Sequence, residues 1–328
     1  MTASADLSAA ELRPPQGRVP DFFIAGNAKS GTSALYRMLR RHPQIYMPDV
    51  KEPSFFVPEL QLPRQKSPNY SDTFEEYLSL FDAARPEQRV GEATPSYLWS
   101  RTAASRIADV QPAARIIAIL REPASFLRSL HLQFVQNHVE TETDLRKAVG
   151  LEELRRQGEA LPGDSTRPQA LLYSDHVRYV EQLRRYHAIF PPEQVLVLIY
   201  EDFRRDNEST VRTVLRFLDV DDTSPIEVME WNPTVRVRSP RLYGLVRSLY
   251  LGRGPAARAT KAGIKVLTPR RVRHDALALQ RRVQWGKPLP PDEELMLELR
   301  RRFKGEVVAL SEYLDRDLVT FWGYDNIG

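Results

Sequence analysis

Three short apolar segments, each followed by a polar turn and a helical pattern, constrain the fold of this chain more than any other feature. The apolar segments cover residues 22–26, 114–120 and 195–200. The helical patterns that follow cover residues 34–41, a segment that begins at about 125, and residues 208–218. Short apolar runs alternating with helices are typical of strands buried in a parallel sheet. The sequence therefore predicts an α/β fold, a doubly wound parallel sheet flanked by helices, with ligands bound at the carboxyl ends of the strands.

The first of these turns has the sequence Gly26-Asn-Ala-Lys-Ser-Gly-Thr-Ser33. Glycine lets the backbone come close to a phosphate group, and the N–H groups at the start of a helix attract an anion. The turn is therefore typical of a phosphate-binding loop, and the expected sheet is of the P-loop type. A P-loop kinase is an alternative that fits poorly, because Lys29 precedes Gly31 whereas a Walker loop has its lysine directly after the second glycine.

The composition excludes several kinds of site and bounds the domain organisation. The 328 residues include no cysteine, which excludes disulfides, thiolate nucleophiles and Cys-ligated metals. The six histidines lack the spacing of a metal site, so we expect no metal. We expect residues 1–20 to be a disordered leader and residues 21–328 to be a single domain. No stretch has the pattern of a signal peptide or a transmembrane helix, which predicts a cytoplasmic protein.

The charge of the chain is concentrated in one segment near the C-terminus. The net charge is +4, yet residues 236–287 carry 14 Lys and Arg against one acid, Asp275. We expect 236–290 to be a mostly helical region that covers donor and acceptor. A dense basic segment also suits a membrane- or nucleic-acid-binding protein. Nucleic acid fits poorly, because the segment has few aromatic side chains and no recognisable module. Residues 243–252 are amphipathic, which predicts a peripheral membrane contact.

Several motifs, taken together in order and spacing, resemble one family. The loop at 26–33 resembles the 5′-phosphosulfate loop of sulfotransferases that use 3′-phosphoadenosine 5′-phosphosulfate (PAPS). Leu120-Arg-Glu-Pro-Ala-Ser-Phe-Leu-Arg-Ser129 resembles the 3′-phosphate motif of these enzymes. Lys51-Glu-Pro-Ser-Phe-Phe56 and Gly91-Glu-Ala-Thr-Pro-Ser-Tyr97 are similar to blocks of the heparan-sulfate-type and bacterial branches. The resemblance extends from about residue 21 to 325.

The resemblance implies a reaction and a set of binding residues. A sulfuryl group would pass in line from PAPS to a hydroxyl or amine of a glycan, glycolipid or secondary-metabolite acceptor, leaving adenosine 3′,5′-bisphosphate and needing no metal. Lys29 would stabilise the transition state, and Arg121 with Ser129 would hold the 3′-phosphate. The residues implied to hold the 5′-phosphate are Ser30, Gly31, Thr32 and Ser33. Those implied as further nucleotide contacts are Tyr179, Arg236 and Arg238.

The same resemblance assigns a catalytic base and shows one departure from the family pattern. Glu52 matches the glutamate that takes the proton of the acceptor in the heparan-sulfate-type enzymes, a role that needs a carboxylate within hydrogen-bond reach of the acceptor. Ala93 stands where those enzymes have a lysine. Lys51 and a basic arginine of the C-terminal region are the two candidates to replace that cation.

Overall fold

The structure is a computed structural model that describes residues 17–58, 71, 73–162, 168–227, 236–237, 285–286 and 289–327. Most of the expected leader at 1–20, most of the basic region at 236–290, and Arg238 lie outside the described residues. The chain divides into two compact units. The first comprises Met1–Phe126, Ser174–Asn232 and Leu297–Gly328, and the second comprises Leu127–Tyr173 and Pro233–Met296. The single domain expected over 21–328 stays a prediction.

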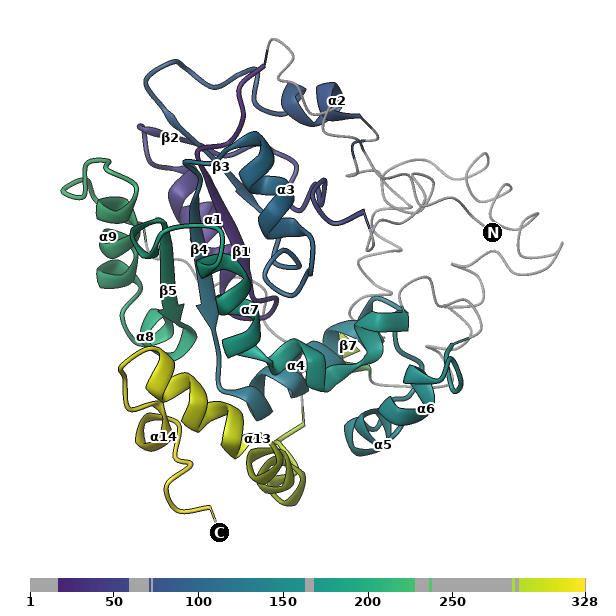
Figure 1. The fold of residues 1–328 in the computed structure, drawn as a ribbon. Coiled ribbons are helices and arrows are strands. Elements are labelled where there is room, and N and C mark those ends of the chain that lie inside the picture. Colours follow the sequence, from purple (N-terminus) through teal and green to yellow (C-terminus); the bar gives the residue numbers. More distant parts are fainter. Residues whose placement is uncertain are drawn as a thin grey trace, which may run out of the picture. The chain divides into compact units, whose positions relative to one another are not determined.

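The first unit is built on a five-stranded sheet in the order β2-β3-β1-β4-β5, with every neighbouring pair parallel (Figure 1). Its strands are β1 (Phe22–Gly26), β2 (Ile45–Tyr46), β3 (Arg89–Ala93), β4 (Arg115–Leu120) and β5 (Val195–Ile199). The predicted parallel α/β sheet is confirmed, and β1, β4 and β5 coincide with the three apolar segments. Since these three strands are adjacent and parallel, their carboxyl ends meet at one edge of the sheet.

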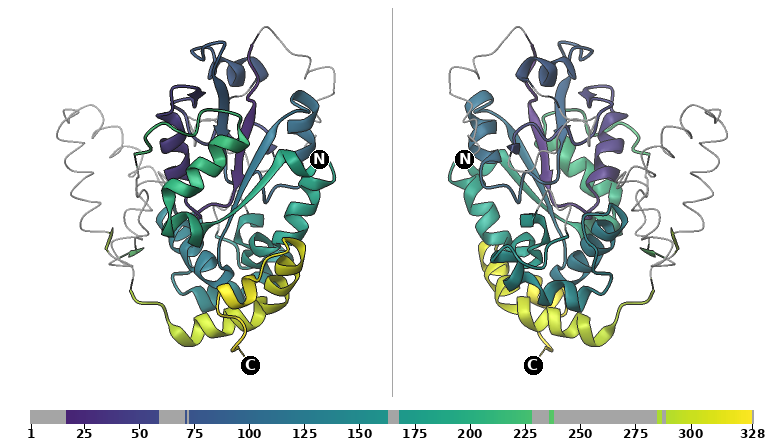
Figure 2. Two further views of the ribbon diagram at one scale, coloured as in Figure 1. Left: turned by 90° about the vertical axis from the view of Figure 1, so that its left-hand side faces the viewer. Right: turned by 90° about the vertical axis from the view of Figure 1, so that its right-hand side faces the viewer.

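Helices cover both faces of this sheet, as a doubly wound fold requires (Figure 2). One face packs against α1 (Thr32–Arg40) and α9 (Asn207–Phe217), where Phe22, Leu35 and Val214 share one buried cluster. Phe23 points to the opposite face, with its ring centroid 5.8 Å from that of Phe56. The helices that lie on this second face in Figure 2 are α3 (Ala103–Val110) and α7 (Tyr179–His187).

The remaining described elements of the first unit surround the two ends of the sheet. They are α2 (Phe74–Ser79), η4 (Tyr173–Val177), η5 (Pro192–Gln194), α8 (Tyr200–Arg205), α13 (Glu293–Tyr313) and α14 (Leu318–Phe321). The boundary between the units falls within η4 and α13. Asp292 accepts a hydrogen bond from the Leu295 N–H and so satisfies a backbone donor in the first turn of α13. None of the described helices is both long and apolar enough to cross a bilayer.

The second unit contains most of α4 and a short strand pair. Its elements are α4 (Pro123–Gln136), α5 (Leu145–Gly150), α6 (Glu152–Arg156), η3 (Pro168–Leu171), β6 (Arg236–Val237) and β7 (Trp285–Gly286). β6 and β7 pair antiparallel, with Arg236 opposite Gly286. The described residues 236–237 and 285–286, near the two ends of the basic region, are therefore extended, and the mostly helical character expected for 236–290 stays a prediction. The interior of that region lies outside the described residues.

A buried ion pair holds the second unit together. The Arg155 guanidinium lies 2.9 Å from Glu140 Oε2, and both side chains are almost inaccessible to solvent. The Tyr173 hydroxyl donates to the same carboxylate at 3.1 Å, and the backbone N–H groups of Thr141 and Glu142 donate to it as well. Because every lone pair of this carboxylate has a donor, the desolvation of the charges is offset by direct contacts.

Removing one partner of this pair should therefore be costly. We expect Arg155→Met to lower the free energy of unfolding by about 3–5 kcal/mol, because the Glu140 charge stays buried without its cation. The matched control is Arg156→Met, whose exposed pair with Glu153 should contribute less than about 1 kcal/mol. Urea denaturation followed by circular dichroism measures both. Equal losses in the two variants would contradict a specific role for the buried pair.

Candidate functional site

The loop between β1 and α1 has a backbone conformation that requires glycine at one position, Gly31. Gly31 has φ of 87°, in the left-handed region, and a Cβ placed there would lie 2.9 Å from the Phe203 ring. Lys29 also has a positive φ, 59°. α1 then begins at Thr32 with no side-chain cap on its first N–H groups. The loop thus presents the start of a helix, with its backbone donors and positive dipole end, at the carboxyl edge of the sheet.

Two of the predicted site residues, Lys29 and Arg121, come together at this edge. Arg121 directly follows β4 and donates from Nη1 to the Lys29 carbonyl oxygen at 2.8 Å. Its guanidinium carbon lies 4.6 Å from the centre of the Tyr200 ring, a cation–π contact. Burial, and next the nearby Arg121 charge, lower the pKa of Lys29. Within the described ranges no carboxylate forms a direct ion pair with either side chain, while the Glu201 carboxylate interacts with the Arg121 charge at longer range.

Two buried donors in the same region also have no hydrogen-bond partner within the described part of the chain. They are Asn27 Nδ2 and Arg121 Nε. Buried donors are normally satisfied, so each marks a place where an acceptor is missing. Together with the unpaired cations, they fit an anionic ligand at the loop.

Tyr179, another of the predicted site residues, contacts the backbone of Arg121. The Tyr179 side chain is wholly buried, and its hydroxyl donates to the Arg121 carbonyl oxygen at 2.9 Å. Desolvation raises the pKa of this hydroxyl well above its ordinary value, so it remains a donor. The structure thus gives Tyr179 a supporting contact to Arg121, and its expected contact with a nucleotide stays a prediction.

The acids that follow Arg121 and Tyr200 bind the C-terminal residues. Glu122 accepts from the Tyr324 hydroxyl at 2.5 Å and from the N–H groups of Ala124 and Ser125 at the start of α4. Glu201 accepts from the Trp322 indole at 3.0 Å, and burial raises the pKa of Glu201. Both carboxylates are hydrogen-bonded to other groups, and neither forms a direct ion pair with Arg121 in the described ranges, although the Arg121 charge acts to lower the pKa of Glu201.

The predicted base, Glu52, lies on a separate loop attached to the end of β3. Its N–H donates to the Ala93 carbonyl at 3.1 Å, and its backbone has φ of 63°. The side chain is half exposed, and its carboxylate pairs with the Lys51 ammonium group. Ala93 lies opposite Ile24 of β1 in the sheet, so the Glu52 loop hangs from the strand next to the one that carries the Lys29 loop.

A buried carboxylate beneath that loop, Glu92, was not predicted as a site residue. It accepts hydrogen bonds from the hydroxyls of Tyr77 at 2.6 Å, Thr94 at 2.5 Å and Tyr97 at 3.1 Å. Its side chain is inaccessible to solvent, and this burial raises its pKa from 4.5 to about 7. The sequence signal that could have identified Glu92 is its position, because it is an acid directly before Ala93 in the block Gly91–Tyr97 that resembles the family.

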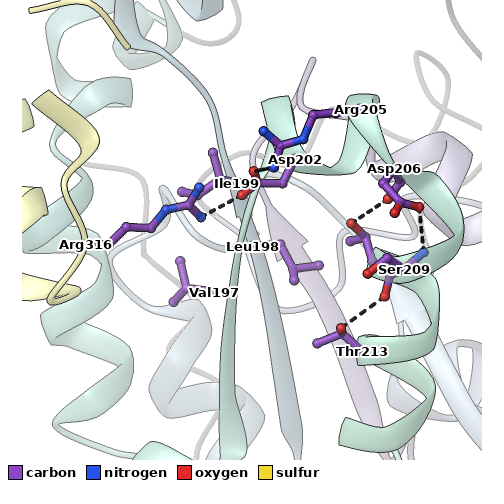
Figure 3. A pocket seen from close by; sticks show the side chains of 10 residues that line it. Val197, Leu198, Ile199, Asp202, Arg205, Asp206, Ser209, Thr213 and Arg316 are labelled. Carbon is purple, nitrogen blue, oxygen red and sulfur yellow. Dashed lines mark hydrogen bonds and ion pairs between the residues drawn. The ribbon is translucent and has the colours of Figure 1, made fainter. Parts of the chain in front are cut away.

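A cavity of about 420 Å³ lies along the outer edge of β5, and its lining does not include Lys29 or Arg121 (Figure 3). It contains two arginines, Arg205 and Arg316, and both pair with Asp202, at 2.9 and 2.6 Å. Both guanidinium groups also lie over the Phe321 ring. Each of these cations thus has a direct ion pair with Asp202, unlike Lys29 and Arg121, which have none in the described ranges.

The sequence model of the sulfotransferase family matches residues 20–224, which include both the Lys29 loop and Arg121. The chain belongs to the sulfotransferase family. A crystal structure of a sulfotransferase from Alicyclobacillus acidocaldarius is 27% identical and covers 92% of this chain and 98% of its own, with a TM-score of 0.64. The P-loop-type fold expected from the sequence is thereby confirmed.

Two curated relatives of this chain have names that refer to carbohydrates. Carbohydrate sulfotransferase 15 of Mus musculus is 26% identical over 68% of this chain and 48% of its own length. Bifunctional heparan sulfate N-deacetylase/N-sulfotransferase 3 of Homo sapiens is 27% identical over 62% of this chain and 22% of its own length. The chain therefore spans about half, or less, of the relatives it matches.

The other predicted site residues are distributed over several elements. Ser30 is fully buried in the loop, and Thr32 and Ser33 form the first turn of α1. Ser129 is buried on α4 and belongs to the second unit. Arg236 lies in β6. Among the described residues no group of three or more acids and histidines is placed to hold a metal ion.

The Glu92 carboxyl should make the stability of the protein depend on pH. Since the folded protein binds this proton more tightly than the unfolded chain, its stabilisation is complete below pH 4.5 and is lost as the pH rises through about 7. Relative to Glu92→Gln, the wild-type free energy of unfolding should fall by about 3 kcal/mol over this range. Urea denaturation of both proteins in a series of buffers measures the difference. A difference that stays constant with pH would contradict the raised pKa.

Proposed function

We propose that this protein transfers a sulfuryl group from PAPS to a hydroxyl or amine of a carbohydrate acceptor, with adenosine 3′,5′-bisphosphate as product. The observation that carries the proposal is the pair of neighbouring cations, Lys29 and Arg121, near the ends of adjacent strands, neither of which has a direct ion pair among the described residues. Two phosphate groups and a sulfonate are the kind of anion that would relieve the repulsion between them. The carbohydrate names of the relatives favour a glycan over a secondary metabolite as acceptor.

In this proposal the donor is held by the edge of the sheet. The N–H groups and hydroxyls of residues 30–33 bind the 5′-phosphate at the start of α1. Arg121 presents a planar fork of donors to the 3′-phosphate, with the hydroxyl of Ser129 as a second contact. Tyr179 keeps the Arg121 backbone in place. Support comes from the unpartnered Nε of Arg121 and from its lack of an acidic partner in the described ranges.

The transfer itself needs one proton acceptor and one stabilising cation. Glu52 takes the proton of the acceptor hydroxyl or amine as the new bond to sulfur forms. The bond from sulfur to the 5′-phosphate oxygen breaks, and Lys29 stabilises the negative charge that develops there. Lys51, which contacts Glu52, supplies the second cation in place of the lysine that the family has at Ala93. Positioning and charge stabilisation thus account for the catalysis, as in phosphoryl transfer.

Nucleotide binding tests the donor site. Adenosine 3′,5′-bisphosphate at about 100 times its Kd should stabilise the protein by about 2.7 kcal/mol and raise Tm by several degrees. Arg121→Ala should abolish most of that shift, because it removes the fork that binds the 3′-phosphate. Arg216→Ala, an exposed arginine on α9, is the matched control and should keep the shift. Stabilisation by ATP with Mg²⁺ and not by the bisphosphate would overturn the proposal in favour of a kinase.

Turnover tests the base. Glu52→Gln should lower kcat by about 10²–10⁴-fold, because the amide cannot take the acceptor proton. The bisphosphate-induced Tm shift should remain, since Glu52 is not assigned to the nucleotide. A screen of glycan, glycolipid and small-molecule acceptors with labelled PAPS supplies the substrate, and Glu87→Gln serves as an exposed control. Full turnover by Glu52→Gln would show that another group is the base.

A further inference from the structure

The buried carboxylate Glu92 lies beneath the loop at 51–57 and accepts hydrogen bonds from three hydroxyl groups. Oε1 accepts from Thr94, and Oε2 accepts from both Tyr77 and Tyr97. In the described parts of the chain no basic side chain pairs with Glu92. A buried carboxylate without a cation is costly, and an apolar residue would suit a central strand better. Its presence therefore needs an explanation beyond packing.

Two of the three hydroxyls connect this carboxylate to the backbone of the loop. Thr94 Oγ1 accepts from the Ser54 N–H at 3.3 Å, and the Tyr97 hydroxyl accepts from the Phe56 N–H at 3.5 Å. A hydroxyl has one proton to donate and two lone pairs that accept. Because each hydroxyl donates its hydrogen bond to Glu92, a lone pair of each hydroxyl remains available to accept a hydrogen bond from an N–H of the loop. The carboxylate thus orients both hydroxyls as acceptors.

The third hydroxyl, on Tyr77, provides an internal comparison. It donates to the same Oε2 as Tyr97 does, but its recorded contacts with the loop are through the ring. The ring centroid lies 4.8 Å from that of Phe55 and 5.3 Å from that of Phe56. Removing this hydroxyl would take one donor from Glu92 and leave both links to the loop backbone.

The loop itself needs to be held, because its backbone is strained on both sides of Pro53. Glu52 and Ser54 have φ of 63° and 58°, left-handed values that are unfavourable for residues other than glycine. Ser54 Oγ donates to the Glu52 carbonyl at 3.2 Å, so the two residues are also joined to each other. Strained backbone of this kind persists only where the surroundings hold it in place.

We infer that Glu92 is a positioning residue. Through the hydroxyls of Thr94 and Tyr97 it anchors the backbone that follows Glu52, and so fixes where the Glu52 carboxylate meets the acceptor. The inference rests on the proposed role of Glu52 as base. It adds that accurate proton transfer depends on a hydrogen-bonded network that begins at Glu92 in β3. None of the residues of this network is assigned to donor or acceptor binding.

Single-hydroxyl variants test this inference. Thr94→Val and Tyr97→Phe each break one link to the loop, Tyr77→Phe is the matched control, and Thr94→Ser restores the hydroxyl. Amide hydrogen exchange at Ser54 should become faster in Thr94→Val, and exchange at Phe56 faster in Tyr97→Phe. Neither amide should change in Tyr77→Phe, and Thr94→Ser should behave as the wild type.

The same variants should separate in their kinetics. We expect kcat to fall about 10-fold to 100-fold in Thr94→Val and Tyr97→Phe, because small displacements of a reacting group are costly. The bisphosphate-induced Tm shift should not change, and Tyr77→Phe should keep kcat within about 2-fold of wild type. An equal loss of kcat in Tyr77→Phe, or unchanged exchange at both amides, would overturn the positioning role and leave the proposed function standing. If the wild type transfers no sulfuryl group to any acceptor, the proposed function fails, whereas faster exchange at Ser54 and Phe56 still supports the anchoring of the loop.

Discussion

Two like charges held close together, Lys29 and Arg121, are the constraint from which the organisation of the site follows. Their repulsion adds to desolvation in lowering the pKa of Lys29. The fold withstands this repulsion because β1 and β4 are adjacent and parallel, so a hydrogen bond from Arg121 to the Lys29 carbonyl can join the two strand ends. The Tyr200 ring beneath Arg121 and the Tyr179 hydroxyl on its carbonyl hold the arginine there. Two neighbouring cations favour an anionic ligand, which supports the proposed nucleotide with two phosphates.

The acids near this edge form no direct ion pair with Arg121 in the described part of the chain. Glu122 binds the first N–H groups of α4 and the Tyr324 hydroxyl, and Glu201 binds the Trp322 indole. The C-terminal residues therefore act as hydrogen-bond partners for these carboxylates, while Glu201 interacts with the Arg121 charge at longer range. The cavity along β5 shows a different arrangement, because Asp202 forms direct ion pairs with both of its arginines. The comparison indicates that direct ion pairing of a cation in this fold depends on where each nearby acid finds its partner.

The limits of prediction from the sequence follow from the same physics. β1, β4 and β5 could be predicted because each is a continuous apolar run, and Lys29 and Arg121 because they stand at the ends of such runs. β3 was missed because Glu92 interrupts its apolar character, and β2 because it has only two residues. The partners of a side chain, such as Tyr179 with the Arg121 carbonyl, depend on segments far apart in the chain and have no local signal. The strand pair of β6 and β7 joins residues about 50 positions apart, and such a pairing has no local signal either.

β1 connects the two halves of the proposed chemistry. Its carboxyl end carries the loop for the donor, and its neighbour β3 carries the loop of the base, with Ile24 opposite Ala93 in the register. Close packing of these strands depends on Gly91, where a Cβ would lie 2.1 Å from the Phe22 ring and 2.5 Å from the Met47 sulfur. A side chain at that position would have to displace Phe22 from the core, and with it the strand that holds Lys29. The proposed donor loop and the loop of the proposed base are thus attached to one strand pair. A change deep in the sheet would therefore displace both loops.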